Sequence, residues 1–163
     1  MKNDMKNNKK KIVYIDMDNV LVDFKTGIDK LEPSIQLEYK DRLDEVPNIF
    51  SLMEPYTNAI DSVHKLAAKY DLYLLSTAPW LNPTAWSDKI KWVHKYFGKD
   101  EDSLFCKKLI LSHHKNLNNG DYLIDDRPNN GAENFKGEWI HFGKDEFPDW
   151  NAVTTYLLEH HNA

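Results

Sequence analysis

The sequence predicts an α/β protein built on a mainly parallel five-stranded sheet. Five apolar runs support this fold class, because a continuous apolar run is typical of a strand buried on both faces of such a sheet. The runs occupy residues 11–16, 72–77, 108–112, 122–125 and 139–142. Helical patterns lie between them, and strands that alternate with helices indicate a parallel sheet with helices packed on it. The 163 residues, of which 41% are hydrophobic, suffice for one domain with its own core.

The first crossover helix is expected after residue 57. Its apolar residues recur three or four positions apart, as on one face of a helix, and they are Ile60, Val63, Ala67 and Tyr70. Thr57 is a candidate N-cap, because its hydroxyl can accept a hydrogen bond from a free N–H group of the first turn.

A second helix is expected at residues 86–97. Its apolar stripe consists of Trp86, Ile90, Val93 and Phe97. Gly98 follows as a C-terminal stop, since glycine readily adopts the backbone conformation that ends a helix. A last helix is expected at residues 152–160.

Residues 24–55 interrupt this alternation. They are too many for an ordinary connection, which has a few residues. Within them, residues 35–46 are highly charged and are predicted to be helical up to Pro47. We interpret the segment as a small helical cap, inserted after the first strand over one end of the sheet. A single domain then covers residues 11–163, and the Lys- and Asn-rich residues 1–10 are expected to form a disordered basic tail.

Composition excludes several classes of protein. The 21 basic and 26 acidic residues give a net charge of −5, which argues against a surface for nucleic acid polymers. No apolar run reaches the ~20 residues of a membrane span, and no apolar stretch of signal-peptide length follows the basic start. The single cysteine, Cys106, excludes an internal disulfide and a zinc site built on cysteines. These observations predict a cytoplasmic protein that binds neither a membrane nor a nucleic acid polymer.

Polar side chains gather at the carboxyl ends of the predicted strands, where open α/β sheets bind their ligands. Acidic pairs follow the first and the fourth strand, two hydroxyl residues end the second strand, and a lysine follows the third. These residues are Asp16 and Asp18, Asp125 and Asp126, Ser76 and Thr77, and Lys115.

The acidic pairs predict a site for Mg²⁺. An isolated Asp-x-Asp more often caps the turn that follows it. Carboxylates from two strand ends, however, repel each other unless a cation lies among them. Oxygen ligands with a partly open shell suit Mg²⁺, which usually shares its site with substrate phosphate.

The hydroxyl pair and the lysine are candidate phosphate ligands. Ser76 and Thr77 offer hydroxyl and backbone N–H groups where a strand enters a loop, and such turns can cradle an anion. Lys115 supplies a positive charge for phosphate oxygens and for a neighbouring carboxylate.

In this order the residues resemble the four motifs of the haloacid dehalogenase-like phosphatases. The run IDMDNVLVDF at residues 15–24 resembles the first motif, Ser76-Thr77 the second, Lys115 the third and Asp125-Asp126 the fourth. More narrowly, the Asp-Phe that ends the first run, LIDDRP at residues 123–128 and WIHF at residues 139–142 resemble the cytosolic 5′(3′)-deoxyribonucleotidase branch. The resemblance covers about residues 12–158.

The resemblance implies a three-layer Rossmann-like sandwich with a cap, and a two-step phosphoryl transfer. Asp16 would attack phosphorus and form an aspartyl-phosphate. Asp18 would protonate the leaving oxygen and then deprotonate the water that cleaves the intermediate.

The resemblance also implies the ligands of the metal and of the phosphate. Mg²⁺ would be held by Asp16, the backbone carbonyl of Asp18 and Asp125, with Asp126 as a further ligand or beside the ligands. The phosphoryl oxygens would be held by Ser76, Thr77 and Lys115.

Two motif positions depart from the pattern of the family. Asn19 stands where deoxyribonucleotidases usually carry glycine, and asparagine tolerates the left-handed backbone conformation better than most residues. The second motif reads Ser-Thr rather than Thr-Ser, which leaves open the division of work between Ser76 and Thr77.

Apolar residues near the cap hinges are candidates for a substrate pocket. Phe24, Ile49, Phe50 and Met53 either form a slot over a nucleobase or anchor the cap to the core. Trp80 is either a further pocket wall or a cover for the sheet. Base stacking on aromatic side chains contributes about 1–3 kcal/mol per base in nucleic-acid binders.

The sequence therefore predicts a Mg²⁺-dependent phosphatase of nucleoside monophosphates, with deoxyribonucleotides as the expected substrates. One alternative keeps the mechanism and changes the substrate to another small phosphomonoester, such as a sugar phosphate. A second alternative is a non-hydrolytic, receiver-like phospho-signalling module, which the order of the motifs disfavours. Base preference, 5′ or 3′ regiochemistry and oligomeric state, including a homodimer, are left open.

Overall fold

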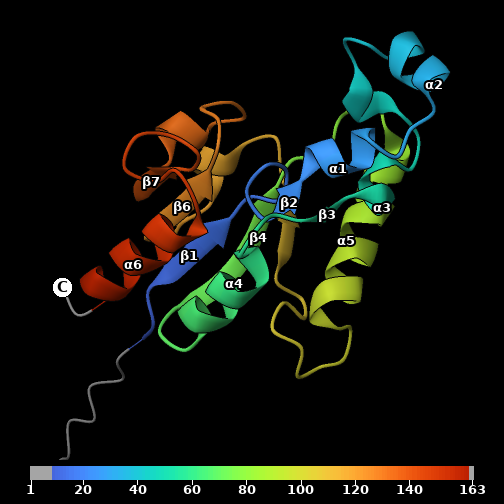
Figure 1. Cartoon of the computed structure of the whole chain (residues 1–163). Coiled ribbons are helices and arrows are strands. Elements are labelled where there is room, and N and C mark those ends of the chain that lie inside the picture. The colour runs from blue at the N-terminus through green and yellow to red at the C-terminus, as the bar shows by residue number, and fades with distance from the viewer. Residues whose placement is uncertain (1–8, 162–163) are drawn as a thin grey trace, which may run out of the picture.

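A computed structural model describes residues 9–161 and contains a five-stranded, fully parallel sheet (Figure 1). The strands are β1 (Ile12–Ile15), β4 (Asp71–Ser76), β5 (Leu109–Leu111), β6 (Tyr122–Asp125) and β7 (Glu138–His141), in the spatial order β5-β4-β1-β6-β7. All four neighbouring pairs are parallel. The predicted fold class is confirmed, and each strand lies within one residue of its predicted bounds at both ends.

The continuous apolar run of β1 is explained by burial on both faces of the sheet. Val13 and Ile15 point into the larger hydrophobic core, which includes residues of α4 (Ala59–Ala67) and α6 (Trp150–His160). Tyr14 points to the other face and packs edge-on against Phe135 with ring centroids 5.9 Å apart. Because successive strand residues face opposite sides, both sides must be apolar in a covered sheet.

The helices differ in detail from the periodic patterns. α4 and α6 pack against each other, and the N-cap of α4 is Asn58 rather than the predicted Thr57. α5 (Pro83–Phe97) ends at Gly98, as predicted. Its predicted apolar stripe is confirmed at Val93, which is buried, and at Phe97, which packs against the core, but it is wrong at Trp86, which is 39% exposed. The buried residues of α5 are Ala85, Asp88, Lys89, Trp92 and Val93.

The segment between β1 and α4 forms several short elements. They are α1 (Phe24–Ile28), α2 (Pro33–Glu38), the 3-10 turn η1 (Leu43–Glu45) and α3 (Ile49–Leu52). The prediction of one helix over residues 35–46 is wrong, because α2 ends at Glu38 and only η1 follows. β2 (Val22–Asp23) and β3 (Glu54–Pro55) pair antiparallel and bring together the two ends of residues 24–55, here called the cap. The cap contacts α5 through α3.

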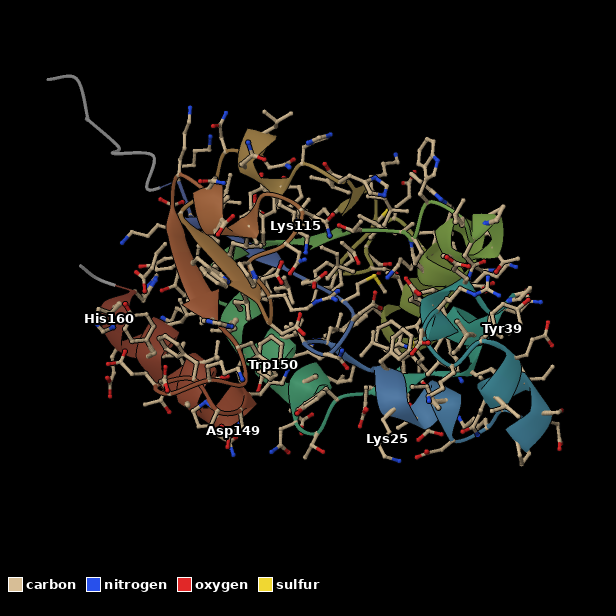
Figure 2. The ribbon with its side chains drawn as sticks, turned by 90° about the horizontal axis from the view of Figure 1, so that it is seen from above. Lys25, Tyr39, Lys115, Asp149, Trp150 and His160 are labelled. Atoms are coloured by element: carbon tan, nitrogen blue, oxygen red, sulfur yellow. The ribbon has the colours of Figure 1, made fainter. Side chains whose placement is uncertain are left out.

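Seen from above, the cap and the C-terminal helix lie at opposite ends of the molecule (Figure 2). Tyr39 belongs to the cap, His160 ends α6, and Lys115 lies between them. Within residues 9–161, no helix is long and apolar enough to cross a membrane. The tail predicted for residues 1–10 falls outside this range except for Lys9 and Lys10.

The strand order positions the functional residues. β1 lies in the middle of the sheet, with β4 on one side and β6 on the other. All three strands run in the same direction, so their carboxyl ends meet at one edge. The motifs that follow these strands are therefore neighbours in space, although they lie up to about 110 residues apart in the chain.

Candidate active site

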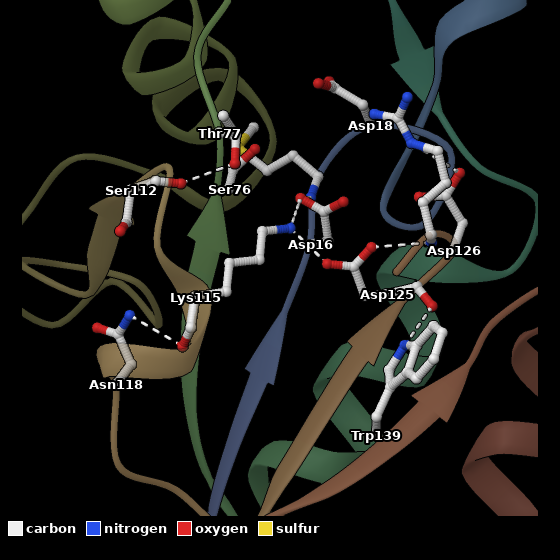
Figure 3. Close-up of polar contacts among 12 residues, drawn as sticks. Asp16, Asp18, Ser76, Thr77, Ser112, Lys115, Asn118, Asp125, Asp126 and Trp139 are labelled. Carbon is white, nitrogen blue, oxygen red and sulfur yellow. Dashed lines mark hydrogen bonds and ion pairs between the residues drawn. The ribbon is translucent and has the colours of Figure 1, made fainter. Parts of the chain in front are cut away.

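The ends of the three central strands meet around the ammonium group of Lys115 (Figure 3). Lys115 begins the 3-10 turn η2 (Lys115–Leu117) and is 3% exposed. Its Nζ lies 2.5 Å from Asp125 Oδ2 and 3.0 Å from Asp16 Oδ1. Burial acts to lower the pKa of Lys115, but the two carboxylates outweigh it and the pKa is raised. The lysine is therefore held as a buried cation between the ends of β1 and β6.

Three carboxylates form an acidic cluster beside this lysine. Asp16, Asp125 and Asp126 each offer one oxygen, and these atoms lie within 4.8 Å of one another. The pKa of Asp125 is raised to about 7 and that of Asp126 to about 6, first by burial and then by the nearby Asp16, while the neighbouring cations oppose the shift. The cluster therefore resists full ionisation without a cation.

The donor set of the acidic cluster fits a small divalent cation. Every candidate ligand is a carboxylate oxygen, which is the type that Mg²⁺ and Ca²⁺ prefer over softer sites. Asp126 Oδ1 is buried and has no hydrogen-bond partner among the described residues. A buried oxygen of this kind carries a desolvation cost unless a cation or a donor lies against it.

Asp18 lies in a different environment from Asp16, although only two residues separate them. The chain turns tightly after β1, and the carbonyl of Met17 accepts hydrogen bonds from the next turn. Asn19 has a φ of 59° in this turn, which is the left-handed conformation expected of the residue at this position. The Asp18 carboxylate pairs with Lys89 through Oδ2 at 2.8 Å and does not belong to the acidic cluster.

Burial sets the protonation tendency of Asp18. It raises the pKa of this carboxyl group, and the ammonium of Lys89 opposes the shift without cancelling it. A carboxyl group with a raised pKa can hold a proton and give it up, as a general acid must.

The two hydroxyl residues at the end of β4 face different surroundings. Ser76 is fully buried, and its Oγ lies 3.1 Å from Lys89 Nζ. Thr77 donates its hydroxyl to the carbonyl of Ser112 at 2.7 Å and lines the cavity above the acidic cluster. The structure thus places Thr77, rather than Ser76, where a ligand could reach it.

A cavity of about 570 Å³ lies between the strand ends and the cap. This volume suits a small organic ligand. The cap contributes Phe24, Lys40, Asp41, Leu43 and Asp44 to its wall. The core contributes Asp18, Asn19, Thr77, Pro79, Trp80, His113, Arg127, Asn129 and Asn130. A narrow recess with Asp16, Lys115 and Asp125 on its walls adjoins this cavity and shares part of its lining.

The candidate pocket residues divide into two groups. Phe24 and Trp80 line the cavity, and Trp80 is 78% exposed. Phe50 and Met53 are buried. Phe50 packs edge-on against Phe24 with ring centroids 5.8 Å apart, so it supports the cavity wall from behind.

Sequence reasoning missed several residues of the site. The clearest example of a missed residue is Lys89. Its spacing could have identified it, because it lies three positions before Trp92 and four before Val93, on the buried face of α5. A lysine in that stripe requires a buried partner. Arg127 and Asn129 directly follow the last acidic pair, but polar residues in a loop give no comparable signal.

Comparisons with known proteins identify the family of the chain. Residues 38–151 match the family model described as 5′ nucleotidase, deoxy (Pyrimidine), cytosolic type C protein. A Vibrio phage KVP40 protein assigned to the 5′(3′)-deoxyribonucleotidases is 57% identical over 148 residues, which cover 91% of this chain and 85% of the relative. The human mitochondrial 5′(3′)-deoxyribonucleotidase is 30% identical over 74% of this chain and 64% of its own length. The human cytosolic type is 27% identical over 79% of this chain and 77% of its own length.

Proposed function

The chain belongs to the 5′(3′)-deoxyribonucleotidase family of phosphoric monoester hydrolases, and we propose that it is a Mg²⁺-dependent phosphatase of deoxyribonucleoside monophosphates. One observation carries the proposal: a buried lysine and three clustered carboxylates meet at the strand ends, beside a recess that adjoins a cavity of about 570 Å³. Such an arrangement can bind a phosphate group and a cation together.

Asp16 is the proposed nucleophile. Its Oδ1 accepts a hydrogen bond from the N–H of Met17 at 2.8 Å and pairs with Lys115. These contacts fix the orientation of the carboxylate and fall on one oxygen, so Oδ2 is the oxygen that we assign to the attack on phosphorus. The attack forms an aspartyl-phosphate and releases the nucleoside oxygen.

Asp18 is the proposed general acid and base. It donates a proton to the departing nucleoside oxygen as the bond from that oxygen to phosphorus breaks. It then accepts a proton from the water that attacks the aspartyl-phosphate, which yields inorganic phosphate and restores Asp16. The raised pKa of the Asp18 carboxyl group supports the first of these roles.

The phosphate group is proposed to lie between the acidic cluster and the end of β4. Lys115 and Thr77 are its proposed ligands, whereas the fully buried Ser76 contacts Lys89 rather than the cavity. Mg²⁺, held by Asp16, Asp125, Asp126 and the backbone carbonyl of Asp18, would neutralise the negative charge of the phosphate as Asp16 approaches. The buried, unpartnered Oδ1 of Asp126 supports its inclusion among the metal ligands.

The nucleobase is proposed to occupy the cavity next to Trp80 and Phe24. Both aromatic side chains line the cavity, and the buried Phe50 packs against Phe24 from behind. Deoxyribonucleotides are preferred in this proposal over sugar phosphates because the aromatic wall suits a base. The cytoplasm is the proposed compartment, since the chain has a single cysteine.

A panel of phosphomonoesters tests the proposed function. We expect phosphate release that requires Mg²⁺, is abolished by chelator, and has its highest kcat/KM with deoxyribonucleoside monophosphates. Deoxyribose 5-phosphate, which lacks the base, should react with a kcat/KM lower by about 5- to 150-fold, the equivalent of about 1–3 kcal/mol of stacking. Ribonucleotides, 3′-nucleotides and sugar phosphates complete the panel. Equal values of kcat/KM for substrates with and without a base would contradict the proposed nucleotidase activity. Rates that chelator does not change would contradict the proposed dependence on Mg²⁺.

Metal binding is expected to stabilise the fold. At a Mg²⁺ concentration of about 100 times its Kd, the free energy of unfolding should increase by about 2.7 kcal/mol. For a chain of this size, the corresponding rise in melting temperature is about 5–10 °C. Calorimetry in Mg²⁺ and in chelator measures the shift. Asp125→Asn should remove it, whereas Asp29→Asn, at an exposed ion pair with Lys25, should retain it. An equal shift in both variants would place the cation elsewhere.

A further inference from the structure

Lys89 is a buried lysine outside the four motifs. It lies in α5 and is 1% exposed. A lysine is almost never fully buried unless its charge is paired, because removing an ammonium group from water is costly. The position therefore calls for specific partners.

Two hydrogen bonds and one aromatic contact surround the Lys89 ammonium group. Its Nζ lies 2.8 Å from Asp18 Oδ2 and 3.1 Å from Ser76 Oγ. It also lies 4.4 Å from the ring centroid of Phe50, within the range of a cation–π contact. An ammonium group has three N–H donors, of which Asp18 and Ser76 take two, and the remaining side of the group faces the ring of Phe50. Lys89 is thus a poor candidate for a substrate ligand.

The contact with Lys89 makes the two oxygens of Asp18 unequal. Oδ2 is fixed by the ammonium group, while Oδ1 is buried and has no hydrogen-bond partner within residues 9–161. Asp18 also lines both the large cavity and the recess of the acidic cluster. One oxygen is therefore held, and the other is left for a group that enters the cavity.

We propose that Lys89 is a positioning residue, which holds Asp18 by Oδ2 so that Oδ1 carries out the proton transfers. The proposal rests on the proposed function. In the first step, the proton leaves Asp18 Oδ1 for the ester oxygen as that oxygen separates from phosphorus and Asp16 bonds to phosphorus. In the second step, Oδ1 takes a proton from water as the water oxygen bonds to phosphorus and Asp16 is released.

The third contact of Lys89 ties this arrangement to the cap. Phe50 lies in α3, and its ring contacts both Lys89 and Phe24 at the cavity wall. Ser76, on the opposite side, belongs to β4 of the sheet. Lys89 thus contacts the cap, the sheet and Asp18 at one point.

The first test is Lys89→Met, which removes the charge and keeps the length of the side chain. We expect the rate of nucleoside release in the first turnover to fall about 30- to 100-fold with a deoxyribonucleoside monophosphate, with KM changed less than about threefold. With 4-nitrophenyl phosphate the fall should be less than about fivefold, because a good leaving group departs without a proton. Lys91→Met is the matched control, since Lys91 lies on the same helix with its side chain 69% exposed. An equal fall for both substrates would overturn the proposal.

A double-mutant cycle separates positioning from a merely structural role. If Lys89 acts through Asp18, then adding Lys89→Met to Asp18→Asn should change the first-turnover rate by less than about threefold. The double variant also leaves no buried charge without its partner, so it tests the proposal even where Lys89→Met alone is unstable. Losses that multiply fully in the double variant would overturn the proposal.

Crystal structures of the wild-type and Lys89→Met proteins give a readout that does not depend on turnover. Asp18 should occupy one conformer on Lys89 in the wild type and several conformers in the variant. An Asp18 that keeps its single conformer in the variant would overturn the proposal. A wild type that hydrolyses no phosphomonoester would remove the proposed function, whereas release of Asp18 in the variant would still support the positioning contact.

Discussion

Replacing Asp16 by asparagine is expected to abolish phosphate release, with a fall in kcat on the order of 10⁴- to 10⁶-fold, as for the loss of other catalytic nucleophiles. An amide is a poor nucleophile, so the proposed aspartyl-phosphate cannot form. The substitution also removes one carboxylate from the acidic cluster and a partner from Lys115. Phosphate release at saturating substrate and Mg²⁺ measures the effect.

Two controls make the Asp16→Asn result specific. Asp29→Asn, on the exposed surface of the cap, should retain normal turnover. Acid quenching of the wild type with ³²P-labelled substrate should leave label on the protein, and the Asp16→Asn protein should carry none. A variant that keeps more than about 1% of the wild-type kcat would assign the nucleophile to another residue.

The sheet could be predicted because its strands have a simple physical requirement. A strand covered on both faces needs apolar side chains at every position, so β1 and β6 stand out as continuous runs. The predicted bounds of β6 are those of the structure. The motifs converge because the strands that precede them are parallel and adjacent. The acidic cluster could therefore also be predicted from the sequence.

The helices were less predictable because periodicity alone does not say which of two adjacent stripes is buried. In α5, Trp86 looked like a core residue and is partly exposed, whereas Lys89 looked like a surface residue and is buried. The position of Lys89 depends on a partner 71 residues away, Asp18. The hydropathy of neighbouring residues does not indicate an ion pair between residues so far apart in the chain.

The cap was the least predictable part for a related reason. The spacing of Tyr39, Leu43 and Val46 is compatible with a helix, yet α2 ends at Glu38 and only the turn η1 follows it. Asn82, in the loop before α5, is 1% exposed and donates to the carbonyls of Asp44 and Val46. The local sequence does not predict these hydrogen bonds. The polar residues that the cap adds to the cavity wall could therefore not be predicted from the sequence.

The same long-range contacts separate the roles of the two aspartates of the first motif. Asp16 lies beside Lys115 and two further carboxylates, where a metal and a phosphate would meet. Asp18 lies against Lys89 and has one unpartnered oxygen. Two carboxyl groups placed in such different surroundings can perform different chemistry at one pH.

Replacing Asp18 by asparagine is expected to lower kcat by about 10²- to 10⁴-fold while changing KM little, because a general acid contributes about that factor and the amide keeps the shape of the side chain. Stopped-assay kinetics with a deoxyribonucleoside monophosphate measures both constants. The rise in melting temperature caused by Mg²⁺ should persist in Asp18→Asn, since the side chain of Asp18 is not part of the acidic cluster. The same rise should shrink in Asp16→Asn, whose side chain is. Near-normal turnover in Asp18→Asn would remove the acid–base role, and loss of the Mg²⁺ effect in that variant would instead make its carboxylate a metal ligand.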